Sequence, residues 1–131
     1  MEQAKYVLTF FFEWGGGCLW PSNDAASRDF ELGPYDLLDP CPLPLSAATR
    51  EQCRRMADWH DTSLNWDYPP DPGPWRQPEC DRFHAAVTGL LADIRRELGA
   101  DFDVVNHQCE AVEDPDLDAY LADPKGFRRH E

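Results

Sequence analysis

Cys18 is the residue of this sequence whose setting most directly suggests chemistry, because it follows three consecutive glycines. A glycine turn lets the backbone approach a substrate and supply N–H donors, and a nearby histidine would activate the thiol. His60, His84 and His107 are the candidate bases. Cysteine is also among the most often buried residue types, and a turn between two strands needs no catalysis. We therefore favour a structural role for Cys18 and keep a thiol-dependent hydrolase built on it as an alternative.

Three aspartates at alternate positions, Asp114, Asp116 and Asp118, have the spacing that opens a calcium-binding loop. Such a loop needs Gly at its sixth position and Glu at its twelfth. Ala119 and Lys125 occupy those positions, so the segment is predicted to be solvated and acidic rather than a metal site. The common nucleotide, zinc-protease and serine-hydrolase motifs are also absent from the sequence. No catalytic residue, metal or cofactor is therefore predicted.

Net charge is the strongest feature of the 131-residue chain. It carries 12 Lys and Arg against 25 Asp and Glu, a formal charge of -13. The stretch from Asp101 to Asp123 contains eight of these acids and no Lys or Arg. A negative field repels nucleic acids and anionic membranes and accelerates encounter with a cationic surface. The expected partner is thus a basic protein, with no direct binding of nucleic acid or membrane.

An aromatic, proline-rich segment, residues 61–78, is the second recognition feature. Rigid aromatic rings surrounded by carboxylates can anchor a basic protein surface. The predicted partner-binding residues, taken from this segment and from the acidic stretch, are Asp61, Trp66, Asp67, Tyr68, Asp71, Trp75, Asp114, Asp116 and Asp118. The tryptophans can equally fold inward and complete a small core, and the sequence leaves both possibilities open for each ring.

The strands and helices expected from the sequence, which must position these residues, indicate one α+β domain over residues 1–131. Alternating apolar residues indicate strands at 5–13, 17–20 and 101–107, forming a small antiparallel sheet. Helical spacing of apolar residues predicts two main helices, 46–60 and 78–98, packed on one face of the sheet. An acidic tail from about residue 113 should contain one short helix around Leu117 and Tyr120.

Cysteine usage and the N-terminal sequence indicate a compartment. Five separated cysteines without a C-x-x-C pair fit reduced thiols better than a disulfide framework. The first fourteen residues lack the pattern of a signal peptide, and no apolar run approaches the length of a membrane span. The expected location is the cytoplasm.

Two motifs carry a family resemblance: W-G-G-G-C-L-W from Trp14 to Trp20, and S-L-N-W-D-Y-P-P-D-P-G-P-W from Ser63 to Trp75. On these motifs the chain resembles a family of small acidic bacterial proteins, which brings no catalytic residues to transfer. The excess of Arg over Lys, with many Ala, Asp and Pro, suggests an actinobacterial source. In size, acidity and lack of catalytic motifs the chain is more loosely similar to immunity proteins that neutralise bacterial toxins.

These observations lead to one functional hypothesis and a runner-up. The chain is expected to be an immunity or antitoxin-type protein that binds and inhibits a basic partner, such as a nuclease toxin. The alternative is a phage-type anti-defence protein whose acids mimic DNA. The sequence leaves the oligomeric state open.

Overall fold

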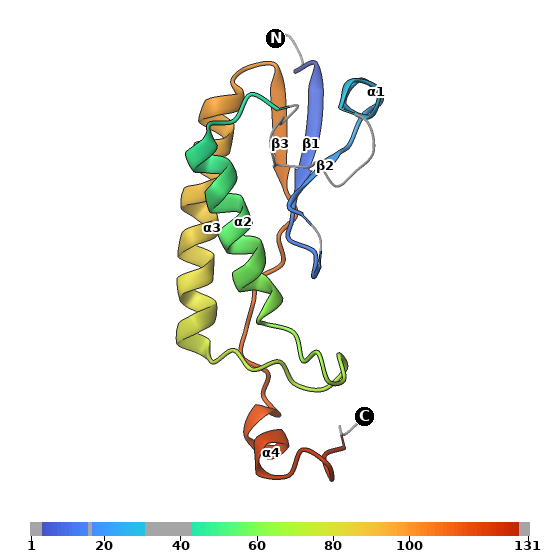
Figure 1. Cartoon of the computed structure of the whole chain (residues 1–131), viewed down its shortest axis with the longest axis vertical. Coiled ribbons are helices and arrows are strands. Elements are labelled where there is room, and N and C mark those ends of the chain that lie inside the picture. The colour runs from blue at the N-terminus through green and yellow to red at the C-terminus, as the bar shows by residue number, and fades with distance from the viewer. Residues whose placement is uncertain (1–3, 16, 31–42, 129–131) are drawn as a thin grey trace.

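The computed structural model describes residues 4–15, 17–30 and 43–128. Its elements, in chain order, are β1 (Tyr6–Phe10), β2 (Leu19–Pro21), α1 (Asp24–Asp29), α2 (Ala47–Asp61), α3 (Gln77–Leu98), β3 (Phe102–Asn106) and α4 (Leu117–Ala122). The three predicted strands and the two predicted main helices are all present. Figure 1 shows α2 and α3 side by side on one face of the sheet, with α4 at the end of the molecule away from the N-terminus. The α+β class is confirmed.

The sheet is mixed, with the strand order β2-β1-β3. β2 returns directly from β1 and pairs with it antiparallel, placing Phe10 opposite Leu19. β3 instead pairs parallel to β1, with Tyr6 opposite Phe102. The expectation of an antiparallel sheet is therefore wrong for β3. The reason is the helical hairpin: α2 runs down the molecule and α3 returns the chain to the level where β1 begins, so β3 sets out in the same direction as β1 (Figure 1).

Local sequence signals explain where the main helices begin and end. The side-chain oxygen of Ser46 accepts a hydrogen bond from the backbone N–H of Thr49 and caps the start of α2. Pro78 occupies the first turn of α3, where a missing N–H costs nothing. Gly99 ends α3 with a φ of 77°, a left-handed conformation that glycine adopts readily. Both helices lie within one residue of their predicted bounds.

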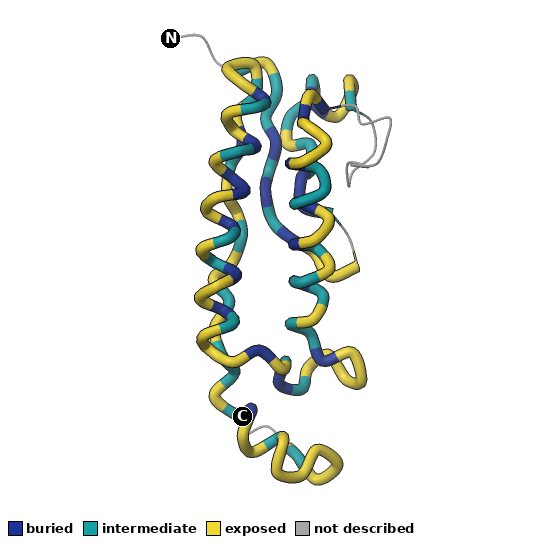
Figure 2. Tube along the Cα trace, turned by 60° about the vertical axis from the view of Figure 1, so that its left-hand side comes forward, coloured by how far each residue is buried: buried dark blue, intermediate teal, exposed yellow. Residues whose placement is uncertain are grey.

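The core lies between the sheet and the α2–α3 pair. Leu8 and Phe10 of β1 and Val104 of β3 are buried, as the alternation of side chains along a strand requires. Facing them, the helices bury one stripe each, including Met56 of α2 and Phe83 of α3. Figure 2 shows these buried stripes turned toward the sheet and the exposed faces of both helices turned outward.

Two short helices complete the described chain. Asn23 caps α1 through its side-chain oxygen, which accepts from the backbone N–H of Ala26. α4 forms in the acidic tail as predicted, and its first residue, Leu117, is buried. Among the described residues, no helix has the length and apolar character needed to cross a membrane.

Candidate functional site

The connection between α2 and α3, residues 62–76, is an ordered loop, called here the aromatic loop. Its organising residue is Asn65, which is buried. The Asn65 side-chain oxygen accepts hydrogen bonds from the backbone N–H groups of Asp67 and Tyr68, both at 3.1 Å, and its amide donates to the carbonyl of Pro72 at 3.2 Å. One buried side chain thus holds both arms of the loop together.

The tryptophans of this loop divide between surface and core. Trp66 is 58% exposed and Tyr68 is 59% exposed, whereas Trp75 is only 6% exposed. The Trp75 indole donates to Thr62 Oγ1 at 2.8 Å and packs against Trp59 and Phe83. Of the two possibilities that the sequence left open, Trp75 follows the inward one, and Trp66 and Tyr68 are available to a partner.

α4 lies against the aromatic loop at the same end of the molecule (Figure 1). Arg76 donates to the Asp118 carboxylate at 2.8 Å and lies 3.7 Å from the Glu113 carboxylate. These interactions raise the pKa of the Arg76 guanidinium, chiefly through the hydrogen bond to Asp118. Leu117, buried at the start of α4, adds an apolar contact. The acidic tail and the aromatic loop are therefore one connected surface.

A groove of about 280 Å³ runs between the aromatic loop and α4. It is lined mainly by apolar side chains, among them Trp66 on the loop and Tyr120 and Leu121 on α4. Leu121 is exposed, and the exposed Asp67 contributes a carboxylate to the lining. We call this surface the aromatic–acidic face; its residues are Trp66, Asp67, Tyr68, Asp71, Asp118, Tyr120 and Leu121.

The predicted binding residues occupy different positions on this surface. Asp67 and Asp118 are exposed, and Asp71 is half-buried. Asp61 is half-buried at the end of α2, where its carboxylate accepts from the backbone N–H of Gly15 at 2.9 Å. Asp114 and Asp116 precede α4, and the Asp114 carboxylate accepts from the Asp116 backbone N–H. No cluster of three or more potential metal ligands occurs in the described part of the chain.

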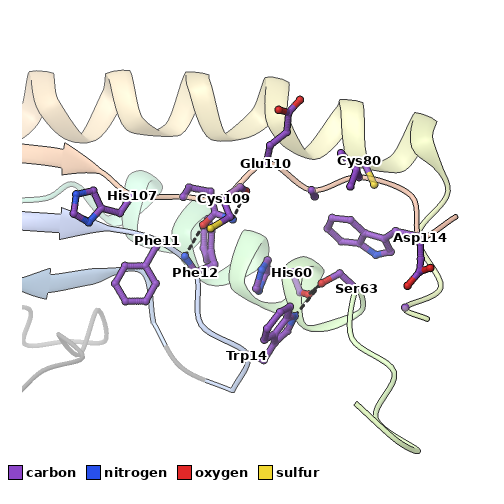
Figure 3. A pocket seen from close by; sticks show the side chains of 15 residues that line it. Phe11, Phe12, Trp14, His60, Ser63, Cys80, His107, Cys109, Glu110 and Asp114 are labelled. Atoms are coloured by element: carbon purple, nitrogen blue, oxygen red, sulfur yellow. Dashed lines mark hydrogen bonds between the residues drawn. The ribbon is translucent and has the colours of Figure 1, made fainter. Parts of the chain in front are cut away.

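On the other side of the aromatic loop lies a cleft of about 370 Å³ that sequence reasoning missed. Its walls are formed by the C-terminal end of α2, the turn after β1 and the segment after β3. Figure 3 shows Phe12, His60 and Trp14 close together in the cleft wall, with Cys109 beside Phe12 and Glu110 on the segment that continues from it. Ser63 and Trp75 also line this cleft, so its walls include both ends of the aromatic loop.

His60 is the polar group at the centre of the cleft wall. The residue is 7% exposed, and its Nδ1 atom has no hydrogen-bond partner among the residues that the structure describes. Its ring stacks on Trp14 and on Phe12, with centroids 5.0 and 5.7 Å away. Burial lowers the pKa of His60, and the nearby Asp61 carboxylate opposes this shift only in part. The imidazole is therefore held neutral, with a ring nitrogen able to accept a hydrogen bond.

Cys18 lies outside both the cleft and the groove. It is buried beside Cys53, and hydrogen bonding to Cys53 together with burial raises the pKa of the Cys18 thiol well above its usual value. A thiol in this state is a poor nucleophile, because the reactive species is the thiolate. Cys18, Cys53, Cys80 and Cys109 are free thiols, and Cys41 lies outside the described residues. The geometry gives no support to a hydrolase built on Cys18.

Comparison with known proteins places the chain in a family. A family model described as Serratia CdiI immunity protein-like matches residues 10–108, about three quarters of the chain. The chain belongs to this immunity protein-like family. No curated protein matches the chain. The looser likeness to toxin-immunity proteins is thereby supported.

The matched region of this immunity protein-like chain contains most of the site. It runs from the end of β1 to just beyond β3, and includes Trp14, His60 and the whole aromatic loop. α4 and its acids lie beyond residue 108. The aromatic–acidic face therefore combines the aromatic loop, which lies within the family match, with α4, which lies outside it.

The sequence carried a partial signal for the missed cleft. Trp14 ends the aromatic run of the first strand, and His60 falls on the apolar face of the helix that precedes the loop. Each fits an ordinary core position when taken alone. Their contact depends on the turn after β1 folding back onto the end of α2, a long-range relationship that neither segment encodes by its own periodicity.

Proposed function

We propose that this protein is an immunity protein that binds a basic bacterial toxin and blocks its active surface. The observation that carries the proposal is the match to an immunity protein-like family over residues 10–108. The net charge of -13 indicates that the partner is positively charged, because a field of this sign attracts a cationic protein. The same family match favours this function over a DNA-mimicking anti-defence protein.

The aromatic–acidic face is the proposed contact surface. Trp66 and Tyr68 are large exposed rings held on an ordered loop, and tryptophan and tyrosine are enriched among residues that dominate binding energy. Asp67 and Asp118 flank them as exposed carboxylates. The aromatic rings would supply most of the affinity, and the carboxylates would set the association rate and the orientation.

A nuclease is the toxin class that this surface suits best. The active surface of a nuclease must be basic to hold a phosphate backbone, and exposed carboxylates can occupy the positions of the phosphates. We further propose that binding takes place in the cytoplasm, since four free thiols are consistent with a reducing compartment.

Capture of the toxin tests the proposal. The tagged protein is exposed to a lysate of its native cells, and bound proteins are identified after washing at low and at high salt. We expect one stoichiometric basic partner that survives the high-salt wash, because apolar anchors resist screening. The captured protein is then expressed alone to determine whether it is toxic; a harmless partner would contradict the proposal.

Binding kinetics with the purified partner locate the contact surface. Asp67→Lys should slow association by about tenfold or more and leave the melting temperature nearly unchanged. Asp103→Lys makes the same charge change at an exposed position on β3, at the other end of the molecule. We expect this control to have a much smaller effect. Equal effects of both substitutions would mean that only overall charge matters, and would exclude the aromatic–acidic face as the contact surface.

A further inference from the structure

The cleft beside His60 has features of a binding site for one side chain of a partner. Its volume of about 370 Å³ is large enough to admit one long side chain. Aromatic rings form much of its wall, and Trp14 remains 47% exposed although it is fixed in place. A rigid ring with a free surface is a suitable platform for stacking.

Hydrogen bonds and ring stacking hold Trp14 in position. Its indole N–H donates to Ser63 Oγ at 2.9 Å, and the Ser63 hydroxyl in turn donates to the backbone carbonyl of His60 at 2.6 Å. The Trp14 ring also stacks on the His60 ring with an interplanar angle of 20°. The turn after β1 and the end of α2 thus present one preformed aromatic surface.

The carboxylates in the cleft lining point to a ligand that is positively charged and donates hydrogen bonds. Among the described residues, no Lys or Arg lines the cleft, whereas Glu110 and Asp114 do, so the local charge favours a cation. A planar cation is preferred over a compact one, because a guanidinium stacks on an indole and has five donors, whereas an ammonium is strongly hydrated.

We propose that the cleft formed by Trp14, His60 and the segment 107–114 binds one arginine side chain of the toxin, with the guanidinium stacked on Trp14. This inference rests on the proposed immunity function for the identity of the partner. The cleft and the aromatic–acidic face share the aromatic loop as a common wall. A toxin seated on that loop would therefore place an arginine in the cleft while covering Trp66 on the other side.

The test uses Nα-acetyl-arginine amide as the probe and needs no toxin. The probe is titrated into the 15N-labelled full-length protein, and the Trp14 indole and His60 ring signals are followed by NMR. We expect saturable shifts of both signals in the millimolar range. The citrulline counterpart has the same shape without the charge and should bind at least about tenfold more weakly. Equal binding of the two probes, or no saturable shift at these signals, would overturn the proposal.

Variants of Trp14 add a second readout. Trp14→Leu should abolish the shift of the His60 ring signal by the arginine probe, and Trp14→Phe should retain weaker binding because it keeps an aromatic face. Should Trp14→Leu lower the melting temperature strongly, the comparison of Trp14→Phe with the unaltered protein still tests the stacking. Undiminished probe binding by Trp14→Leu would contradict the proposal.

The two proposals fail separately. Absence of arginine binding together with capture of a toxin would remove the cleft proposal and leave the immunity function intact. Saturable arginine binding without a toxic partner would contradict the immunity function and leave arginine binding by the cleft established.

Discussion

Trp14 and His60, forty-six residues apart in the chain, stack with ring centroids 5.0 Å apart. The contact joins the turn after β1 to the end of α2, and the bond from the Trp14 indole to Ser63 extends it to the start of the aromatic loop. A loop that is fixed in this way can present exposed rings without a large loss of conformational entropy on binding.

Trp66 and Trp75 should respond oppositely to the same truncation. Trp75→Ala removes a buried ring from the core and should cost about 3–5 kcal/mol of unfolding free energy. Trp66→Ala removes an exposed ring and should change stability by only about 0.5 kcal/mol, while weakening toxin binding strongly. Chemical denaturation and titration with the captured toxin measure the two effects. A large stability loss in Trp66→Ala would place that ring in the core instead.

Gly73 is required by a close backbone approach within the aromatic loop. A Cβ atom at this position would lie 2.0 Å from the backbone oxygen of Ser63. Gly73→Ala should therefore displace Ser63 and destabilise the protein by about 1–3 kcal/mol. Because Ser63 also holds Trp14, the indole signal of Trp14 should shift in the NMR spectrum of the variant.

Gly89 provides the matched control. It lies within α3, and a Cβ there would meet no atom within 4 Å. Gly89→Ala should stabilise the helix by about 0.5–1 kcal/mol. Thermal unfolding of both variants tests the pair, and a Gly73→Ala variant as stable as the unaltered protein would show that the loop does not have this conformation.

The fold was largely predictable because the deciding signals are local. The apolar stripe of α3, the Ser46 cap and the alternation in β1 each identify an element without reference to the rest of the chain. The direction of β3 was not predictable in this way, since it depends on how far α3 carries the chain back along the sheet. Sequence reasoning assumed the commoner antiparallel pairing, and the parallel register of Tyr6 with Phe102 corrects it.

The binding surface was predictable in part. The aromatic residues and acids of the loop and tail were identified by type, and the structure joins the two segments through Arg76 and Asp118. The assignment of Trp66 to the surface and Trp75 to the core required tertiary contacts, because both residues lie in the same proline-rich context. The cleft at His60 was not predictable, because it depends on a contact between segments that are distant in the sequence.

Stability should fall in mild acid because of His60. Its pKa is lowered in the folded protein by burial, so the unfolded chain takes up the proton first as the pH drops through about 6.5. The penalty is therefore nearly absent at neutral pH, grows as the pH falls below about 6.5, and stays at its full size once the folded-state pKa is also passed. Denaturation at about pH 7 and about pH 5.5 measures the effect.

His60→Phe keeps a ring in the stack but cannot titrate, so its stability should change less over this interval. An unchanged pH dependence in that variant would mean that other groups cause the loss.

The four described cysteines should differ sharply in reactivity. Cys109 is exposed, whereas Cys18, Cys53 and Cys80 are buried, and burial raises the pKa of Cys80 as it does that of Cys18. Iodoacetamide should therefore modify Cys109 fastest in the folded protein and reach Cys18 and Cys53 only after unfolding. Peptide mass spectrometry reads out each site. Rapid modification of Cys18 in the folded protein would revive the possibility of a reactive thiol.

Growth rescue tests the central claim most directly. The captured toxin is expressed in a sensitive host alone, with the unaltered protein, with Trp66→Ala and with Asp103→Lys. The immunity account predicts that the toxin alone stops growth, that the unaltered protein and Asp103→Lys restore it, and that Trp66→Ala, although folded, protects poorly. Growth arrest that the unaltered protein does not relieve, at expression levels at least equal to those of the toxin, would contradict the account.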